Sequence, residues 1–548
     1  MRGRRNTHLS NASTSSSSST DTSATTSART SLSEKDLEQC DYLLADDHKP
    51  KPRNPFIFYV FATAICISLF TGFSLWQCST TTVESSPLAI SPAAIPHKAG
   101  GLPFVDDAGK ERWTIYIPPN DSFPLSTPEY QHLCRDAKRL RGTKWSVQQL
   151  LRPSGRDTFH DTSFMDVDAV EASGVLSTST NISPGTCQKS LTFIMDGDAS
   201  FGKTLLLLWM SYGYAKRDGR AFFLDDSAWA YGRYDSYFTP LPRPGCAPPP
   251  RSHLLPCPLQ AKHLVITPTT ARATFDEDVN DIFKRQLPSG RKKDAAVFDL
   301  VRSGYESTFH LIGDDASYAE QRVQQLRASA NQHHQPLVGM HIRRGDLRPF
   351  ELQFSQDYLP VERFTDAAKT SLGPAVDSQG ILLLASDDPD IIDSAELTLA
   401  ASPYHLKKTQ ERIQLATKLA LDRTSPAEPI REPGSAYVKH VDENAGWDGG
   451  FYTGLFYSLG DTRSRQQRLL QGQLSQGGTS KETLRMRELV ARGYLLDLAV
   501  LGQSESVVCA VSSAACRILG VMMGREAIQS GKWVNVDDNR VWSWDGRK

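Results

Sequence analysis

The sequence predicts an α/β protein of two successive halves that face one another across a cleft, preceded by a transmembrane helix and a stem. Three observations lead to this expectation. Residues 56–76 are apolar or small and carry no charge. Two later stretches, which begin at Ser190 and Pro336, alternate short apolar runs with longer helical patterns. The region between the apolar segment and Ser190 is rich in Ser, Thr, Pro and Asp, as is typical of a stem.

The first 54 residues are predicted to form a disordered cytosolic tail, because residues 13–33 are nearly all Ser, Thr and Ala. Residues 55–76 would form a helix of about 30 Å, which spans a bilayer core. Three basic residues lie just before this segment, and none follows it until Lys98. This asymmetry predicts a single-pass type II signal-anchor protein of the Golgi membrane, with the remainder of the chain in the lumen. A buried core helix is the alternative.

Residues 77–185 are predicted to be a lumenal stem that includes a small ordered part around residues 130–151. Two glycosylation sequons lie in this region, at Asn120 and Asn181. Glycosylation at either position requires a lumenal location, so the sequons agree with the predicted orientation.

The cysteines are also distributed as expected for a lumenal protein. Seven of the nine follow the apolar segment, and disulfides persist in that compartment. Cys246 and Cys257 bracket a Pro-rich loop that a disulfide would close, although connectivity does not follow from sequence. Cys509 and Cys516 are expected in the core, where they could be buried thiols.

The N-terminal half, residues 186–335, opens with a βαβ pattern. An apolar run at 191–195 predicts a strand, residues 204–216 an apolar helix, and residues 220–224 a second strand. Two aspartates follow the second strand directly. The unit predicts a parallel pair of strands joined by a crossover helix.

The C-terminal half, residues 336–548, repeats this alternation. The predicted strands lie at 337–342, 381–385, 436–440 and 506–510, and the clearest helices at 363–371, 391–399, 484–501 and 514–523. Two such halves in sequence are typical of paired Rossmann-like domains. In these domains ligands bind beyond the carboxyl ends of the strands.

The sequence HIRRGD at 341–346 places two arginines where a predicted strand ends. Guanidinium groups bind phosphate oxygens bidentately, so Arg343 and Arg344 predict a diphosphate clamp. A surface turn with a local ion pair is the alternative, since turns rich in Gly and Asp are common.

A second candidate nucleotide site lies at 197–204, from Gly197 to Thr204. These residues fit the pattern G-x-x-x-x-G-K-[ST] between a strand and a helix. Lys203 would then bind phosphate and Thr204 would bind Mg²⁺. Asp198 within the loop would repel phosphate, and Phe201 is bulky. A Gly-rich turn that packs parts of the fold together is the simpler interpretation.

Three acidic residues follow the arginine pair. Glu351 lies in a loop, where it could take a proton from an acceptor hydroxyl or be a solvated surface residue. Asp387 and Asp388 follow the predicted strand at 381–385. They could bind ribose hydroxyls or cap the next helix.

The last candidate residues lie toward the C-terminus. Ser512 and Ser513 precede a predicted helix, whose N–H groups and hydroxyls could bind phosphate or form an ordinary cap. Asp497 lies within an apolar helix, and its carboxylate would suit the N1–H and amino groups of guanine. A salt bridge to Arg492 or Arg517 is the alternative.

Together these segments resemble α1,6-fucosyltransferases, both the eukaryotic core N-glycan enzymes and the bacterial nodulation-factor enzymes. The resemblance covers roughly residues 191–524, and its segments are HIRRGD at 341–346, Glu351, LASDDP at 384–389, Leu496-Asp497 and VCAVSSAACR at 508–517. The stretch 197–237 is also similar, which would make Gly202 part of a fucosyltransferase turn. The chain departs from the family pattern at Leu347 and Ala514.

The resemblance implies a GT-B-like fold, GDP-fucose as the donor, and inverting transfer without a metal. The residues that it assigns to the donor are His341, Arg343, Arg344, Asp387, Asp388, Asp497, Ser512 and Ser513. Among them the arginines would hold the diphosphate, His341 and Asp497 would bind guanine, and the two serines would contact phosphate. Glu351 would be the catalytic base.

We therefore expect a membrane-anchored lumenal enzyme that transfers fucose to a glycan or glycoprotein. The net charge of −1 gives no indication of nucleic-acid binding. A dimer is left open. Two alternatives remain: a nucleotide-dependent enzyme that uses residues 197–204, and a non-catalytic fucosyltransferase-like protein that binds glycan.

Overall fold

The structure is a computed structural model. It describes residues 97–142, 161–176, 183–195, 200–275, 290–332, 334–344, 358–373, 380–414, 481–538 and 540–546. The predicted transmembrane segment, the strand expected at 436–440 and Glu351 lie outside these ranges. Within them, none of the helices combines the length and the apolar composition that crossing a bilayer requires.

A β-hairpin and a helix occupy part of the predicted stem. Strands β1 (Gly100–Val105) and β2 (Glu111–Tyr116) pair antiparallel, and α2 (Thr127–Gly142) packs against them. The side chain of Asp106 closes the hairpin by accepting hydrogen bonds from the backbone N–H groups of Ala108 and Lys110. A short helix, α4 (Val167–Ala172), follows. The ordered part therefore begins well before residue 130, where the sequence first indicated it.

The first parallel sheet has the strand order β4-β3-β5. Its strands are β3 (Ser190–Ile194), β4 (Ala221–Asp225) and β5 (His263–Ile266). All residues of the central strand β3 are buried, which explains its continuous apolar run. The predicted βαβ unit is confirmed, with α5 (Phe201–Arg217) as its crossover helix.

Helices follow this sheet along the chain. They are α6 (Ala271–Phe275), α8 (Gly290–Thr308) and α9 (Gly313–Gln332). Helices α5 and α8 touch backbone to backbone, because any side chain at Gly213 would overlap Leu300 and any at Gly304 would overlap Trp209. The absence of a side chain at Gly213 and Gly304 thus allows the two helix backbones to approach each other closely.

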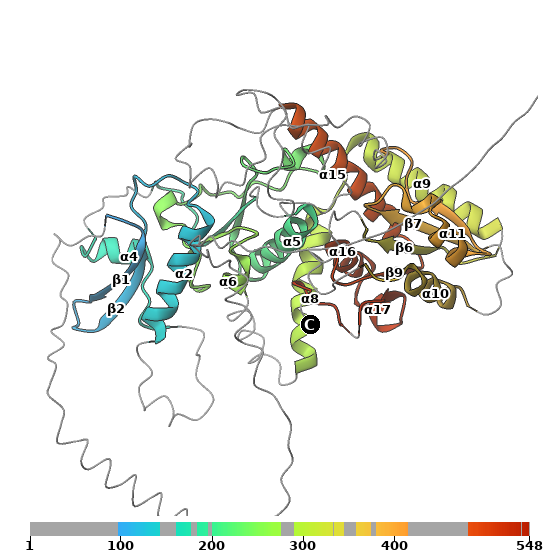
Figure 1. Ribbon diagram of the computed structural model, residues 1–548. Coiled ribbons are helices and arrows are strands. Elements are labelled where there is room, and N and C mark those ends of the chain that lie inside the picture. Colours follow the sequence, from blue (N-terminus) through green and yellow to red (C-terminus); the bar gives the residue numbers. More distant parts are fainter. Residues whose placement is uncertain are drawn as a thin grey trace, which may run out of the picture. The chain divides into compact units, whose positions relative to one another are not determined.

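The second parallel sheet has the strand order β10-β9-β6-β7-β8. Its strands are β6 (Val338–Ile342), β7 (Ile381–Ser386), β8 (His405–Lys408), β9 (Ser506–Cys509) and β10 (Trp533–Asn535). Figure 1 shows β6, β7 and β9 side by side, with α10 and α11 near them. The expected parallel α/β architecture of this part is confirmed.

The helices of this part are α10 (Val361–Leu372), α11 (Ala395–Ala401), α15 (Lys481–Leu501), α16 (Ala514–Met523) and α17 (Arg525–Gln529). The helix expected at 391–399 is divided into a 3₁₀ turn (Ile391–Asp393) and α11. Ser394 causes the division, since its hydroxyl caps α11 by accepting the N–H of Leu397.

Three disulfides connect the described residues. They join Cys134 to Cys257, Cys187 to Cys246, and Cys509 to Cys516. The expected closure of one loop by Cys246 and Cys257 is wrong, because each pairs with a distant cysteine instead. The interpretation of Cys509 and Cys516 as free buried thiols is also wrong.

Candidate functional site

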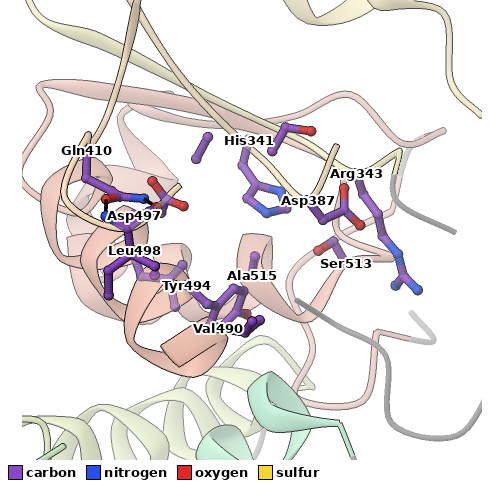
Figure 2. Close-up of a pocket in the computed structure, with 14 residues that line it drawn as sticks. His341, Arg343, Asp387, Gln410, Val490, Tyr494, Asp497, Leu498, Ser513 and Ala515 are labelled. Atoms are coloured by element: carbon purple, nitrogen blue, oxygen red, sulfur yellow. Dashed lines mark hydrogen bonds between the residues drawn. The ribbon is translucent and has the colours of Figure 1, made fainter. Parts of the chain in front are cut away.

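A pocket lies beyond the carboxyl ends of β6 and β7, beside the turn that follows β9. It encloses about 570 Å³, part of which is open to solvent. Its lining residues are His341, Arg343, Ala385, Ser386, Asp387, Gln410, Ile413, Val490, Gly493, Tyr494, Asp497, Leu498, Ser513 and Ala515. Figure 2 shows Asp497 and Gln410 at one side, with Arg343 and Ser513 at the other. Five of the predicted donor residues thus line one pocket.

The alternation of side chains along β6 decides which groups enter the pocket. His341 and Arg343 are two residues apart and both line it, as residues of like parity in an extended chain should. Ile342 lies between them and is buried in a separate cluster that includes Val361 and Leu397. One face of the strand end therefore serves the pocket and the other serves the core beneath α10 and α11.

The side chain of Arg344 lies on the same side of the chain as that of Ile342, and it does not line the pocket. Its guanidinium makes two hydrogen bonds to the carboxylate of Glu396 on α11, at 2.8 and 2.9 Å. Its backbone N–H donates to Asp387 at 2.7 Å, and Tyr358 lies under its guanidinium at 5.7 Å. The structure therefore places only the first arginine of the predicted clamp on the pocket.

The end of β7 is organised by its own side chains. The hydroxyl of Ser386 donates to the carbonyl of Ile342 at 2.7 Å and so ties β7 to β6. Asp388 accepts the N–H of Asp390 at 3.0 Å and so forms a local turn; it does not cap the next helix, since Ser394 caps α11. Asp387 is the aspartate that lines the pocket.

The turn between β9 and α16 brings Ser513 to the pocket. Ser513 occupies the N-cap position of α16, where the unpaired N–H groups and the helix dipole attract anions. Ser512 is not among the lining residues, and its N–H donates to Asp537 at 3.2 Å. Cys509 and Cys516 close the turn from either side.

Residues at and just after the end of β10 also hold this turn, and they were not predicted from the sequence. The N–H of Val511 donates to Asn535 at 2.9 Å. The amide of Asn535 in turn donates to the carbonyls of Asp537 and Arg540. Two apolar residues at 533–534 are too short a run to indicate a strand, so the sequence did not single out Asn535 or Asp537.

Asp497 projects from α15 into the opposite end of the pocket. Its carboxylate accepts hydrogen bonds from the Thr409 hydroxyl and from Gln410. Burial raises the pKa of the Asp497 carboxyl to about 7, and these bonds and the charge of Lys408 offset only part of that rise. The predicted alternative, a salt bridge to Arg492, is wrong because Arg492 pairs with Asp315 at 2.6 Å.

Residues on two segments that were not singled out in the sequence complete the walls, one segment after β8 and the other on the predicted helix α15. Gln410 and Ile413 follow β8, whose sequence HLKK has no apolar run to mark a strand. Gln410 holds this segment by bonding Ile413 through both its amide nitrogen and oxygen. Val490 and Tyr494 lie on α15 one turn apart, on the face that carries Asp497. Their periodicity was visible, but a helical core face gives the same pattern.

Within the phosphate-loop match, the structure describes residues 200–204, which form the packed N-terminal end of α5. Thr204 is fully buried, and its hydroxyl donates to the carbonyl of Ser200 at 2.9 Å. A side chain at Gly202 would meet the Tyr494 hydroxyl at 2.6 Å and Ala514 at 2.9 Å. Lys203 is exposed and does not line the pocket. The geometry favours the interpretation that this turn packs α5 against α15 and α16.

Comparisons with known proteins give distant structural likenesses. No protein-family model and no curated protein matches the chain. A NodZ α-1,6-fucosyltransferase structure soaked with GDP-fucose is similar over 61% of this chain and 93% of its own, with 12% identity and a TM-score of 0.28. An Arabidopsis thaliana FUT1 mutant in complex with GDP is similar over 61% and 69%, with 12% identity and a TM-score of 0.31. A fucosyltransferase NodZ from Bradyrhizobium is similar over 60% and 93%, with 12% identity and a TM-score of 0.25. Because these TM-scores are low, the likeness carries no argument about function, which has to be inferred from the residues of this chain.

Proposed function

We propose that this chain is a glycosyltransferase that binds GDP-fucose in the described pocket and transfers fucose to a glycan or glycoprotein. One observation carries the proposal: the pocket has two chemically opposite ends. Arg343 and the N-terminus of α16 at Ser513 favour an anion, while the Asp497 carboxylate favours hydrogen-bond donors. A guanine nucleotide diphosphate presents those two groups at its two ends.

The base would lie at the Asp497 end. Guanine presents an N1–H and an amino group on one edge, and a carboxylate accepts both. Ile413, Val490 and Leu498 provide apolar surface for the faces of the ring. His341, which lies between the two ends in Figure 2, can bond the base or ribose from the side of β6.

The diphosphate would lie at the Arg343 end. Negative charge grows on the leaving diphosphate as the bond to fucose breaks, so a guanidinium there stabilises the transition state more than the ground state. The N–H groups of α16 act in the same direction. Asp387, a carboxylate near this end, would face ribose hydroxyls rather than phosphate.

The transfer would be a direct displacement with inversion. The carboxylate of Glu351 takes the proton of an acceptor hydroxyl, whose oxygen attacks the anomeric carbon of fucose. The bond from that carbon to the β-phosphate oxygen breaks, and GDP leaves. This role for Glu351 derives from the family resemblance and its position after the arginine pair.

The wider assignment follows the sequence. The two parallel sheets would be the halves of a GT-B-like fold, and residues 55–76 would anchor the chain in the Golgi membrane as a type II protein. In the ranges that the structure describes, no group of three or more His, Cys, Asp or Glu side chains could hold a metal ion. Metal independence nevertheless stays a prediction of the resemblance, as do the α1,6 linkage and a dimer.

The test is transfer of labelled fucose from GDP-fucose to a panel of N-glycan acceptors by the full-length protein. We expect Glu351→Gln to retain GDP binding and to lose transfer by about 10²- to 10⁴-fold, the usual contribution of a general base. Glu362→Gln, in the first turn of α10, is the matched control.

The outcomes separate the alternatives. Full transfer by Glu351→Gln would move the base to another residue. Binding of GDP by the wild type without turnover on any acceptor would favour the non-catalytic glycan-binding protein. Binding of ATP that requires Lys203 would favour the phosphate-loop enzyme.

A further inference from the structure

The two neighbouring arginines leave β6 on opposite faces. Successive side chains of an extended segment point in opposite directions. Arg343 shares its face with His341, and both line the pocket. Arg344 shares the other face with Ile342, which packs in the cluster that contains Leu397 of α11. The two side chains therefore start out on opposite sides of the chain, and only that of Arg343 lines the pocket.

Arg344 is held at three points by three separate elements. The Glu396 carboxylate of α11 receives both terminal nitrogens of its guanidinium, Asp387 at the end of β7 receives its backbone N–H, and the ring of Tyr358 lies under its charge. The side chain of Arg344 is 19% exposed and that of Glu396 is 43% exposed, so the ion pair is partly open to solvent. Because both terminal nitrogens of Arg344 already bind the Glu396 carboxylate, a diphosphate would have to displace that carboxylate to bind Arg344.

We propose that Glu396 is a positioning residue: it fixes Arg344 as a brace between β6 and α11, so that Arg343 alone of the two arginines holds the diphosphate. The inference rests on the proposed function, because it assigns the phosphate contacts of the same pocket. With Arg344 fixed on the α11 side, the residue before it must project to the opposite side. Glu396 thus influences donor binding by fixing the direction in which the Arg343 side chain points, and it does not contact the donor itself.

The charge state of the pair agrees with this role. Hydrogen bonds from Arg344, together with its charge, lower the pKa of the Glu396 carboxyl despite partial burial. The brace is therefore ionised throughout the neutral range. The two parallel hydrogen bonds fix the direction of the Arg344 side chain, which a single contact would not do.

A charge swap in the full-length protein tests the brace. The variants are Arg344→Glu, Glu396→Arg and the double variant that carries both, with Asp393→Asn as the matched control. Asp393 is an exposed carboxylate three residues before Glu396. Dissociation constants for GDP and for guanosine are measured well below the unfolding temperature, and unfolding temperatures are measured without ligand.

We expect each single variant to weaken GDP binding about tenfold and to change guanosine binding far less, because only the diphosphate contact is displaced. The double variant should restore GDP binding to within about threefold of the wild type, as coupled neighbours do. A double variant whose unfolding temperature recovers while GDP binding stays lost would overturn the proposal, since Arg344 would then itself contact phosphate.

A milder variant decides the matter where the swap does not fold. Glu396→Gln should weaken GDP binding if Glu396 positions the chain. Unchanged binding would show that Glu396 does not position the chain, and tighter binding would show that Arg344, once released, is a phosphate ligand; either result overturns the brace. Failure of the wild type and of Asp393→Asn to bind GDP would count against the proposed function instead, and recovery of the unfolding temperature by the swap would still test the brace.

Discussion

Both parallel sheets carry polar residues at the carboxyl ends of their strands, but they use them differently. In the three-stranded sheet, Asp225 accepts the N–H and hydroxyl of Ser227, and Asp226 accepts the N–H of Tyr234. These carboxylates organise their own turns. In the five-stranded sheet, the residues that follow β6 and β7 converge on a pocket with α15 and α16.

This difference shows that polarity at a strand end does not by itself make a site. The three-stranded sheet has the stronger motif in its sequence, since residues 197–204 match a phosphate loop. In the structure, Thr204 of that motif is buried and bonded to its own helix turn. A site requires that several strand ends direct side chains to one volume, and the five-stranded sheet meets this condition.

Arg343→Ala should produce the largest loss in the five-stranded sheet. Each charge-assisted hydrogen bond contributes about 1.5–3 kcal/mol, so the dissociation constant for GDP should rise about 10- to 150-fold. Loss of GDP-dependent thermal stabilisation measures the effect. The control is Arg233→Ala, which removes an exposed arginine near the end of β4. If GDP stabilises Arg343→Ala as much as the wild type, the diphosphate does not bind in this pocket.

Asp497→Asn should change both the strength and the pH dependence of GDP binding. Guanine donors require the ionised carboxylate, and the pKa of Asp497 is raised to about 7 in the ligand-free protein. As pH falls below about 7, a proton must leave before GDP binds, so wild-type affinity should fall up to about tenfold per pH unit. Above that pH the dependence should flatten.

Calorimetric titrations between about pH 5.5 and 8 measure this slope. The phosphate of GDP titrates near pH 6 as well. The Asp497→Asn variant isolates that contribution, because it lacks the titrating carboxyl. Equal slopes in wild type and variant would show that Asp497 does not bind the base.

Gly202→Ala should destabilise the fold through a clash between α5 and its neighbours. Overpacking costs about 1–3 kcal/mol, partly offset by up to about 1 kcal/mol of helix propensity. The unfolding temperature should fall, and the second substitution Tyr494→Phe should restore part of it by removing the hydroxyl that the new methyl meets. Gly245→Ala, at an open position, is the control. An unchanged unfolding temperature together with lost nucleotide binding would return the motif to the phosphate-loop interpretation.

Lys203→Ala should have the smallest effect. The side chain is exposed and outside the pocket, so the dissociation constant for GDP should change by no more than about twofold. Nucleotide titrations with GDP and ATP measure it. Loss of ATP binding in this variant would give the three-stranded sheet a site of its own.

Strands with longer, mostly apolar runs were predictable from sequence. They are β3, β6, β7, β9 and the edge strand β4, and the predicted bounds of α16 also match those observed. The edge strand β5 is apolar and buried but only four residues long, and it was missed. Strands β8 and β10 are short edge strands whose sequences, HLKK and WVN, contain no long apolar run. The pocket wall contributed by Gln410 and Ile413 was hidden for that reason.

Within the site, the sequence indicated residue types better than directions. Arg343 and Arg344 are chemically equivalent candidates, and only the alternation of an extended chain separates them. Asp387 and Asp388 divide in the same way: Asp387 lines the pocket, and Asp388 accepts a backbone N–H within its own turn. In both pairs, the direction of a side chain follows from its parity along the strand, whereas its chemistry is the same as that of its neighbour.

The disulfide between Cys509 and Cys516 makes the turn that carries Ser512 and Ser513 sensitive to the redox conditions around the protein. Both cysteines are fully buried, and the turn with Ser512 and Ser513 forms the short loop between them. Reduction of this bond would open the ring and remove a constraint on the loop that carries Ser513. Because Ser513 lines the pocket, we expect the shape of that end of the pocket to depend on the oxidation state of the two cysteines.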